Sequence, residues 1–162
     1  MTDRFEVSRI IPADASAIFA VLCDPRGHLA IDSSGSIMSV VDEKPVSGVG
    51  DTFGLKMHRE AINDLPLGRY DVTVVITKFE QDQEIQWTVE SPLIDTPIHH
   101  FYGYRLRPTE DGTEVTSYYD WSQVGAWQDR EIPGLGVVRF PIIPEATLRN
   151  TLGILERTVV QG

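Results

Sequence analysis

One long amphipathic segment near the end of the chain most strongly constrains the fold. Residues 144–160 carry apolar side chains at steps of four, three and four residues, which predicts a helix whose narrow apolar stripe is made by Leu148, Leu152, Leu155 and Val159. Nearly all of the chain before this segment alternates as β-strands do, so one helix must cover a whole sheet. Because a single helix rarely fills the concave face of a long curved sheet, the sequence predicts an internal cavity for a small molecule.

The segments before this helix predict seven strands and two short helices. A first strand over residues 4–11 is followed by a helix that Asp14 caps and Asp24-Pro25 ends, and then by a second helical turn over residues 25–30. We therefore expect an α+β single domain over residues 1–162, in which a seven-stranded curved antiparallel sheet wraps around the long C-terminal helix. The other six strands are expected over residues 37–42, 51–59, 70–80, 84–90, 100–107 and 113–121.

The strand over residues 70–80 does not reveal which of its faces points inward. Val72 and Val74 favour one face, whereas Val75 and Phe79 favour the other. A β-bulge, which inserts one extra residue into a strand, would resolve the conflict.

Charge and composition argue against several classes of partner. The 14 Lys and Arg residues against 24 Asp and Glu give a net charge of −10, which repels phosphate backbones, so we expect no nucleic-acid partner. No run approaches the ~20 apolar residues that span a bilayer, so no integral membrane association is expected. Residues 1–6 do not resemble a signal peptide, and Cys23 has no second cysteine to pair with, so a cytoplasmic location is expected.

The aromatic side chains that the alternation directs inward are the candidates for a ligand pocket. Any one of them could simply fill the core, but as a set they exceed what a core of one sheet and one helix needs. Buried Tyr and Trp also carry a polar tip that needs a partner. We expect Tyr119 and Trp121 to form the cavity floor. The expected ligand-binding set is Phe53, Met57, Trp87, Tyr102, Tyr104, Tyr119, Trp121, Leu148 and Leu152.

Two residues are candidates for acid–base chemistry inside such a cavity. His100 shares the predicted inward face of Tyr102 and Tyr104, where it could transfer a proton; the alternative is a hydrogen-bonded or solvated histidine near a strand end. Asp32 follows the second helical turn, and a carboxylate buried beside aromatic rings would have a raised pKa and could act as an acid. The alternative for Asp32 is an ordinary turn or cap with Ser33 and Ser34.

No metal site or cofactor site is expected. The four histidines, His28, His58, His99 and His100, lack the spacing of a metal motif, and the adjacent pair would point to opposite faces of a strand. Gly134-Leu-Gly136 lacks both the third glycine and the strand–helix context of a dinucleotide site.

Two connecting segments carry more apolar residues than loops usually do, and a third is unusually long. Residues 61–68 and 91–97 are expected to form walls of a pocket, since exposed loops tend to shed such side chains. The crossing over residues 123–144 is long enough to act as a lid or to contain a short helix of its own.

The order of elements and several short motifs resemble the START-like (SRPBCC) superfamily, and most closely its actinobacterial polyketide cyclase/dehydrase-like group. The motifs lie at residues 5–19, 23–28, 32–35, 48–53, 112–116 and 119–122. Ile31 stands where many such proteins have tryptophan, so a stacking contact is absent. The resemblance implies the helix-grip fold and a START-like domain that binds or transforms hydrophobic molecules, lipids among them.

These observations support three hypotheses about function. The first is binding of a small hydrophobic molecule, aromatic or polycyclic, for transport or sequestration. The second is an enzyme without a cofactor, a polyketide cyclase, aromatase or dehydratase, in which His100, Asp32 or a pocket tyrosine moves protons. The third is a protein-interaction or co-chaperone module, which would need an apolar patch on the outer face of the sheet. The sequence does not decide between a monomer and a homodimer.

Overall fold

A seven-stranded antiparallel sheet and one long helix dominate the computed structural model, which describes residues 3–62, 64–94 and 96–161. Every strand pairs with its neighbours in the spatial order β1-β7-β6-β5-β4-β3-β2. The expected seven-stranded architecture is therefore confirmed, and the expected ranges agree with the structure to within two residues at each end. The strands are β1 (Arg4–Ile11), β2 (Ile37–Val40), β3 (Thr52–His58), β4 (Arg69–Glu80), β5 (Glu84–Glu90), β6 (Phe101–Thr109) and β7 (Gly112–Asp120).

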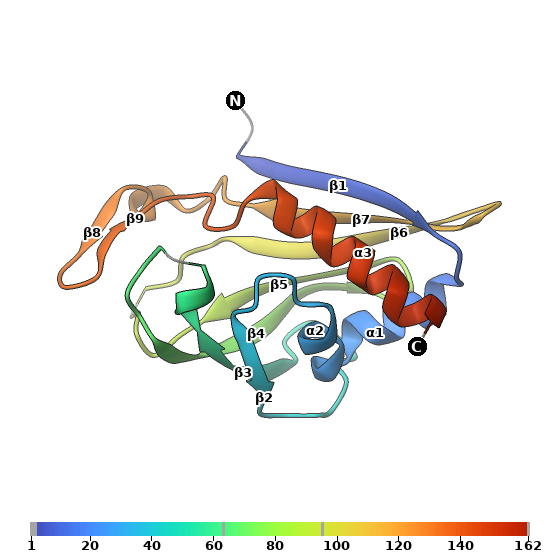
Figure 1. Cartoon of the computed structure of the whole chain (residues 1–162), viewed down its shortest axis with the longest axis horizontal. Helices are drawn as coiled ribbons and strands as arrows, with labels where there is room; N and C mark the ends of the chain where they lie inside the picture. The colour runs from blue at the N-terminus through green and yellow to red at the C-terminus, as the bar shows by residue number, and fades with distance from the viewer. Residues whose placement is uncertain (1–2, 63, 95, 162) are drawn as a thin grey trace.

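The helices cover the concave face of this sheet. Figure 1 shows α3 (Glu145–Gln161) crossing in front of the strands, with α1 (Ala15–Cys23) and α2 (Pro25–Ile31) beside its C-terminal half. The α3 helix packs against β1, β7, α1 and α2. Leu148, Leu152 and Leu155 are buried, so the predicted stripe is the face that α3 turns toward the sheet.

Strand β4 contains a β-bulge, at which its inward-pointing positions change from even-numbered to odd-numbered residues. Such a bulge was the expected way to reconcile the two halves of the strand. Val74 and Ile76 are buried, and the pairing with β5 then shifts between Ile76 and Lys78. The shift leaves Thr77 as the extra residue and returns Phe79 to the inner face, where its ring lies 5.4 Å from that of Phe19. One inserted residue reconciles both halves of the strand with a single core.

The crossing between β7 and α3 contains structure that the sequence predicted only in part. It includes a short helix, η2 (Gly125–Trp127), and a small hairpin, β8 (Arg130–Ile132) with β9 (Gly136–Val138). Figure 1 shows this hairpin extending beyond the end of the sheet. A short helix was one of the two alternatives expected for this crossing. The hairpin was not expected, because strands of three residues are too brief to show the period of two that identifies a strand.

Candidate functional site

A cavity of about 300 Å³ lies between the concave face of the sheet, α2 and the N-terminal half of α3. Most side chains that line it are aliphatic or aromatic, and a few polar groups interrupt them. Seven of the predicted site residues line it: Asp32, Met57, Trp87, His100, Tyr102, Tyr104 and Leu148.

The other four predicted ligand-binding residues, Phe53, Tyr119, Trp121 and Leu152, lie in the packed core and outside the cavity lining. An aromatic row crosses the sheet through directly paired positions, Trp87 on β5, Tyr102 on β6 and Tyr119 on β7. The first two rings line the cavity, whereas the third is fully buried beside His100 and the backbone of Ile142, which precedes α3. The expectation that Tyr119 and Trp121 form the cavity floor is therefore corrected.

Side chains from three loops also line the cavity. The segments expected as walls contribute Ile62, Leu65 and Leu67 from one loop and Leu93 and Ile94 from the other, and Ile98, just beyond the second segment, lines the cavity as well. Asn63 and Asp95, within the two expected wall segments, lie outside the described residues. The crossing between β7 and α3 adds Ile132, Leu135, Val138 and Phe140, so its hairpin also lines the cavity.

His100 occupies a constrained position at the cavity wall. It is 1% exposed, and its Nδ1 lies 2.7 Å from the hydroxyl oxygen of Tyr119. Its backbone carbonyl accepts a hydrogen bond of 2.7 Å from Thr88 Oγ1. The preceding residue, His99, adopts a φ of 61°, a left-handed conformation that non-glycine residues seldom take. Nε2 of His100 has no hydrogen-bond partner among the described residues.

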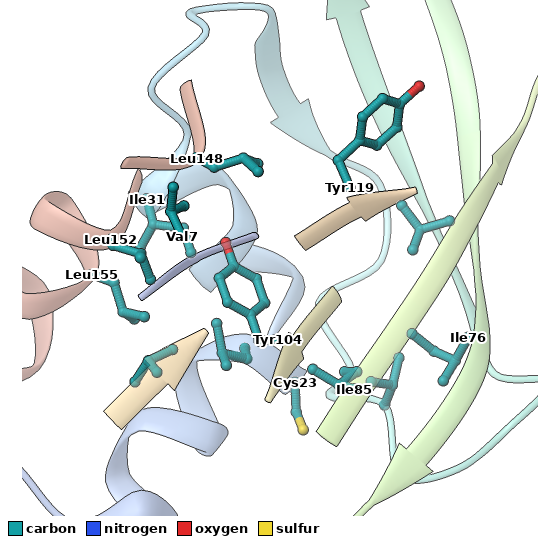
Figure 2. Close-up of a cluster of buried hydrophobic side chains, with 14 of the residues drawn as sticks. Val7, Cys23, Ile31, Ile76, Ile85, Tyr104, Tyr119, Leu148, Leu152 and Leu155 are labelled. Atoms are coloured by element: carbon teal, nitrogen blue, oxygen red, sulfur yellow. The ribbon is translucent and has the colours of Figure 1, made fainter. Parts of the chain in front are cut away.

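Burial keeps the His100 ring uncharged. Desolvation, with a smaller contribution from the nearby Arg59 charge, lowers the pKa of His100 from 6.5 to about 4. The hydroxyl of Tyr119 also interacts with Tyr102 and with the backbone of Ile142, and burial raises the pKa of both tyrosines. Figure 2 shows the Tyr119 hydroxyl pointing away from Leu148, Leu152 and Leu155 of α3. His100, Tyr119 and Tyr102 thus form an uncharged hydrogen-bonded network, and His100 and Tyr102 line the cavity.

Asp32 lines the cavity, but its carboxylate organises the turn that follows α2. Oδ1 accepts hydrogen bonds from the backbone N–H and the hydroxyl of Ser34, at 3.0 and 2.7 Å, and Oδ2 accepts one from the Ile37 N–H at 3.1 Å. Both carboxylate oxygens therefore accept hydrogen bonds from residues of the following turn. This agrees with the alternative interpretation of Asp32 as a turn residue.

The sequence analysis missed an ion pair at the cavity wall. The guanidinium of Arg59 donates to both carboxylate oxygens of Asp64, at 2.8 and 2.6 Å, and its Nη1 donates to the Tyr70 hydroxyl at 3.3 Å. Arg59 is 9% exposed and lines the cavity. No local pattern reveals this pairing, because it depends on how the loop after β3 folds back.

A second buried histidine was also missed. His28, on α2, hydrogen-bonds through Nε2 to the Leu22 carbonyl at 2.8 Å, and its ring packs edge-on against Phe53 and Trp87. Desolvation outweighs that hydrogen bond and lowers the pKa of His28 to about 4. His28 therefore contributes a neutral ring to the cavity wall.

Within residues 3–62, 64–94 and 96–161, no cluster of three or more His, Cys, Asp or Glu side chains is arranged to hold a metal ion. Over the same residues, no helix is long and apolar enough to cross a membrane.

Comparisons with known proteins identify the fold. No model of a known protein family matches the chain. Protein CV1439 from Chromobacterium violaceum is similar in structure, with a TM-score of 0.66 and 13% identity over 98% of each chain. An AHSA1-like protein from Aeromonas hydrophila has a TM-score of 0.63 and 14% identity over 98% of this chain and 92% of its own. These likenesses, together with the sheet order and the long final helix, show a helix-grip fold.

One relative was found by sequence. Uncharacterized protein Rv0088 of Mycobacterium tuberculosis is 28% identical over 119 residues, which cover 72% of this chain and 46% of that protein. The chain thus spans about half the length of the relative that it matches.

Proposed function

We propose that this protein binds a compact, largely apolar aromatic molecule in its internal cavity. The observation that carries the proposal is a cavity of about 300 Å³ whose wall is mainly aliphatic and aromatic, with polar groups at only a few points. Apolar burial would supply most of the affinity, and the polar groups would orient the ligand.

The size of the cavity favours a small ligand. Its volume lies at the lower end of the range of about 300–1,000 Å³ that is typical of ligand pockets. A compact molecule of about two fused rings suits a volume at this end of the range better than a long acyl chain does.

The shape of one wall favours a planar ligand. The rings of Trp87 and Tyr102 lie 5.9 Å apart with an interplanar angle of 16°, so the two side chains present nearly parallel rings beside the cavity. Aromatic rings pack well against such surfaces in offset or edge-on arrangements.

A pair of matched variants tests this proposal. Met57→Trp places a larger side chain in the cavity wall, whereas Met38→Trp makes the same change at an exposed position on β2. We expect displacement of a bound fluorescent dye by naphthalene in the wild-type protein and in Met38→Trp, and a loss of dye binding in Met57→Trp. Equal binding by all three proteins would place the dye elsewhere and contradict the proposal. Native mass spectrometry of the gently purified protein would identify a co-purified ligand.

An enzyme is the second candidate function, favoured by the buried network of His100, Tyr119 and Tyr102 at the cavity. A neutral imidazole held by a tyrosine can transfer protons, as cyclisation or dehydration of a poly-β-carbonyl chain requires. Asp32 is the weaker of the two candidate acids, because its oxygens already accept three hydrogen bonds. Unchanged turnover of such a substrate by a His100→Phe variant would contradict this role.

Membership of the actinobacterial polyketide cyclase/dehydrase-like group is part of the same proposal. It rests on the sequence motifs and on the similarity to the mycobacterial protein. An interaction module is less well supported, because the outer face carries ion pairs such as Arg4 with Asp120 and Arg105 with Glu6. A cytoplasmic location is a prediction that cell fractionation tests, and gel filtration would decide between a monomer and a homodimer.

A further inference from the structure

One buried polar atom at the cavity wall lacks a partner. His100 lines the cavity, its Nδ1 is engaged by Tyr119, and its Nε2 has no hydrogen-bond partner within the described part of the chain. We propose that the ligand carries an aromatic hydroxyl group and that this hydroxyl forms a hydrogen bond with Nε2 of His100. The inference rests on the proposed function and deepens it by naming the chemical class of the ligand.

The position of the His100 ring is fixed by three independent restraints. Thr88 binds its backbone carbonyl, Tyr119 binds Nδ1, and the left-handed conformation of His99 sets the direction of the chain just before it. Unfavourable backbone conformations persist where the surrounding structure holds them, and they concentrate at functional sites. A side chain held this firmly presents its free nitrogen in one orientation.

The missing partner is a neutral group. Buried polar atoms are nearly always hydrogen-bonded. Nε2 of His100 therefore needs a polar partner, which a ligand in the cavity could provide. The charged groups in the buried part of the lining are already used, since the guanidinium of Arg59 is paired with Asp64 and both oxygens of Asp32 accept local hydrogen bonds; Glu90, at the end of β5, is exposed. Neither a carboxylate nor an ammonium group on the ligand would find a free counter-charge among these residues.

A hydroxyl fits better than a carbonyl because of the Tyr119 network. Tyr119 has one hydroxyl proton, which it donates either to Nδ1 of His100 or to Tyr102. In the first case Nε2 carries the ring proton and needs an acceptor; in the second case Nε2 has a lone pair and needs a donor. A hydroxyl serves in both cases, whereas a carbonyl serves only in the first. The Tyr102 ring lies 5.3 Å from that of His100, so an aromatic body would sit beside Tyr102.

The experiment compares 2-naphthol with naphthalene by fluorescence titration at neutral pH. For each protein, the ratio of the naphthalene Kd to the naphthol Kd measures the preference for the hydroxyl. We expect this ratio to fall about tenfold from the wild type to His100→Phe, which corresponds to one hydrogen bond of ordinary strength. Naphthalene itself should bind both proteins with similar affinity.

Two further variants separate the ring nitrogen from general effects on the fold. His58→Phe makes the same change at a histidine outside the cavity lining and should keep the wild-type ratio. The double variant His100→Phe/Tyr119→Phe removes both polar partners together, and it replaces His100→Phe if the single variant does not fold. In the wild type, 2-naphthol should shift the ¹⁵N resonance of His100 Nε2, and naphthalene should leave it in place.

The outcomes distinguish the two proposals. If neither compound binds the wild-type protein, the proposed function fails and this inference fails with it. If both compounds bind but the ratio is the same in the wild type and in the His100 variants, the cavity binds aromatic molecules and only the hydroxyl contact is wrong. A tenfold loss of preference confined to the His100 variants supports the contact.

Discussion

Nδ1 of His100 lies 2.7 Å from the hydroxyl oxygen of Tyr119, and both side chains are at most 1% exposed. This hydrogen bond joins a residue that lines the cavity to one that lies in the packed core. It thereby links the core of the fold to the candidate site, and it leaves the other ring nitrogen, Nε2, without a partner among the described residues.

The first prediction concerns the strength of that link. Tyr119→Phe leaves Nδ1 of His100 buried without a partner and should lower the free energy of unfolding by about 1–3 kcal/mol. In His100→Phe/Tyr119→Phe both partners are apolar, so the loss should be smaller than the sum of the two single losses. Urea unfolding of the four proteins completes a double-mutant cycle. Strict additivity would show that the two side chains do not interact.

The second prediction concerns stability at low pH. The pKa of His28 and that of His100 are lowered in the folded state from 6.5 to about 4, so below 6.5 the unfolded chain takes up protons that the folded chain does not. Stability should therefore be unaffected by these groups above pH 6.5 and fall progressively as the pH drops toward 4, by at most about 3 kcal/mol for each histidine.

Urea unfolding measured from about pH 7 to about pH 4.5 checks this dependence. His100→Phe should show a shallower loss of stability over that range, because one of the two buried histidines is gone. A stability that stays constant through the range would contradict the assignment of both rings as buried and neutral.

The third prediction concerns Gly103, which makes room for Tyr118 on the outer face of the sheet. A Cβ at Gly103 would lie 2.4 Å from the Tyr118 ring and 2.8 Å from the Ile85 carbonyl oxygen. The Tyr118 ring cannot easily move, because its hydroxyl donates to Glu84 at 2.6 Å and the Arg4 guanidinium lies 4.2 Å above it. Gly103→Ala should lower the melting temperature and cost about 1–3 kcal/mol. Partial rescue by Tyr118→Ser would identify the clash as the cause.

The fourth prediction has the opposite sign and uses a glycine inside α3. A Cβ at Gly153 would find Nη1 of Arg9 at 3.7 Å as its nearest described neighbour, which is an ordinary contact distance. Gly153→Ala should therefore raise the free energy of unfolding by about 0.5–1 kcal/mol, because alanine favours the helix and restricts the unfolded chain. Thermal unfolding checks this change; a destabilised protein would mean that close packing at Gly153 requires a glycine.

The fold was largely predictable because each strand and the final helix shows its own hydrophobic period within a short stretch of sequence. Alternation over β5 and the stripe through Leu148, Leu152 and Leu155 depend on the period of one element, which the sequence displays directly. Even the bulge in β4 was foreseeable, since the conflict between Val74 and Phe79 lies within one strand. The hairpin β8–β9 was not, because strands of three residues carry too little pattern.

The site was only partly predictable, because a side chain that is predicted to point inward can lie either in the cavity wall or in the packed core. Tyr102 and Tyr119 have the same residue type and directly paired positions, yet the first lines the cavity and the second lies in the packed core. That difference depends on how segments far apart in the sequence pack over the sheet. The sequence by itself thus determined a sheet, a helix and a set of inward aromatic side chains, since these follow from local periodicity. Only the tertiary structure decided which of those side chains face the cavity, because that follows from long-range packing.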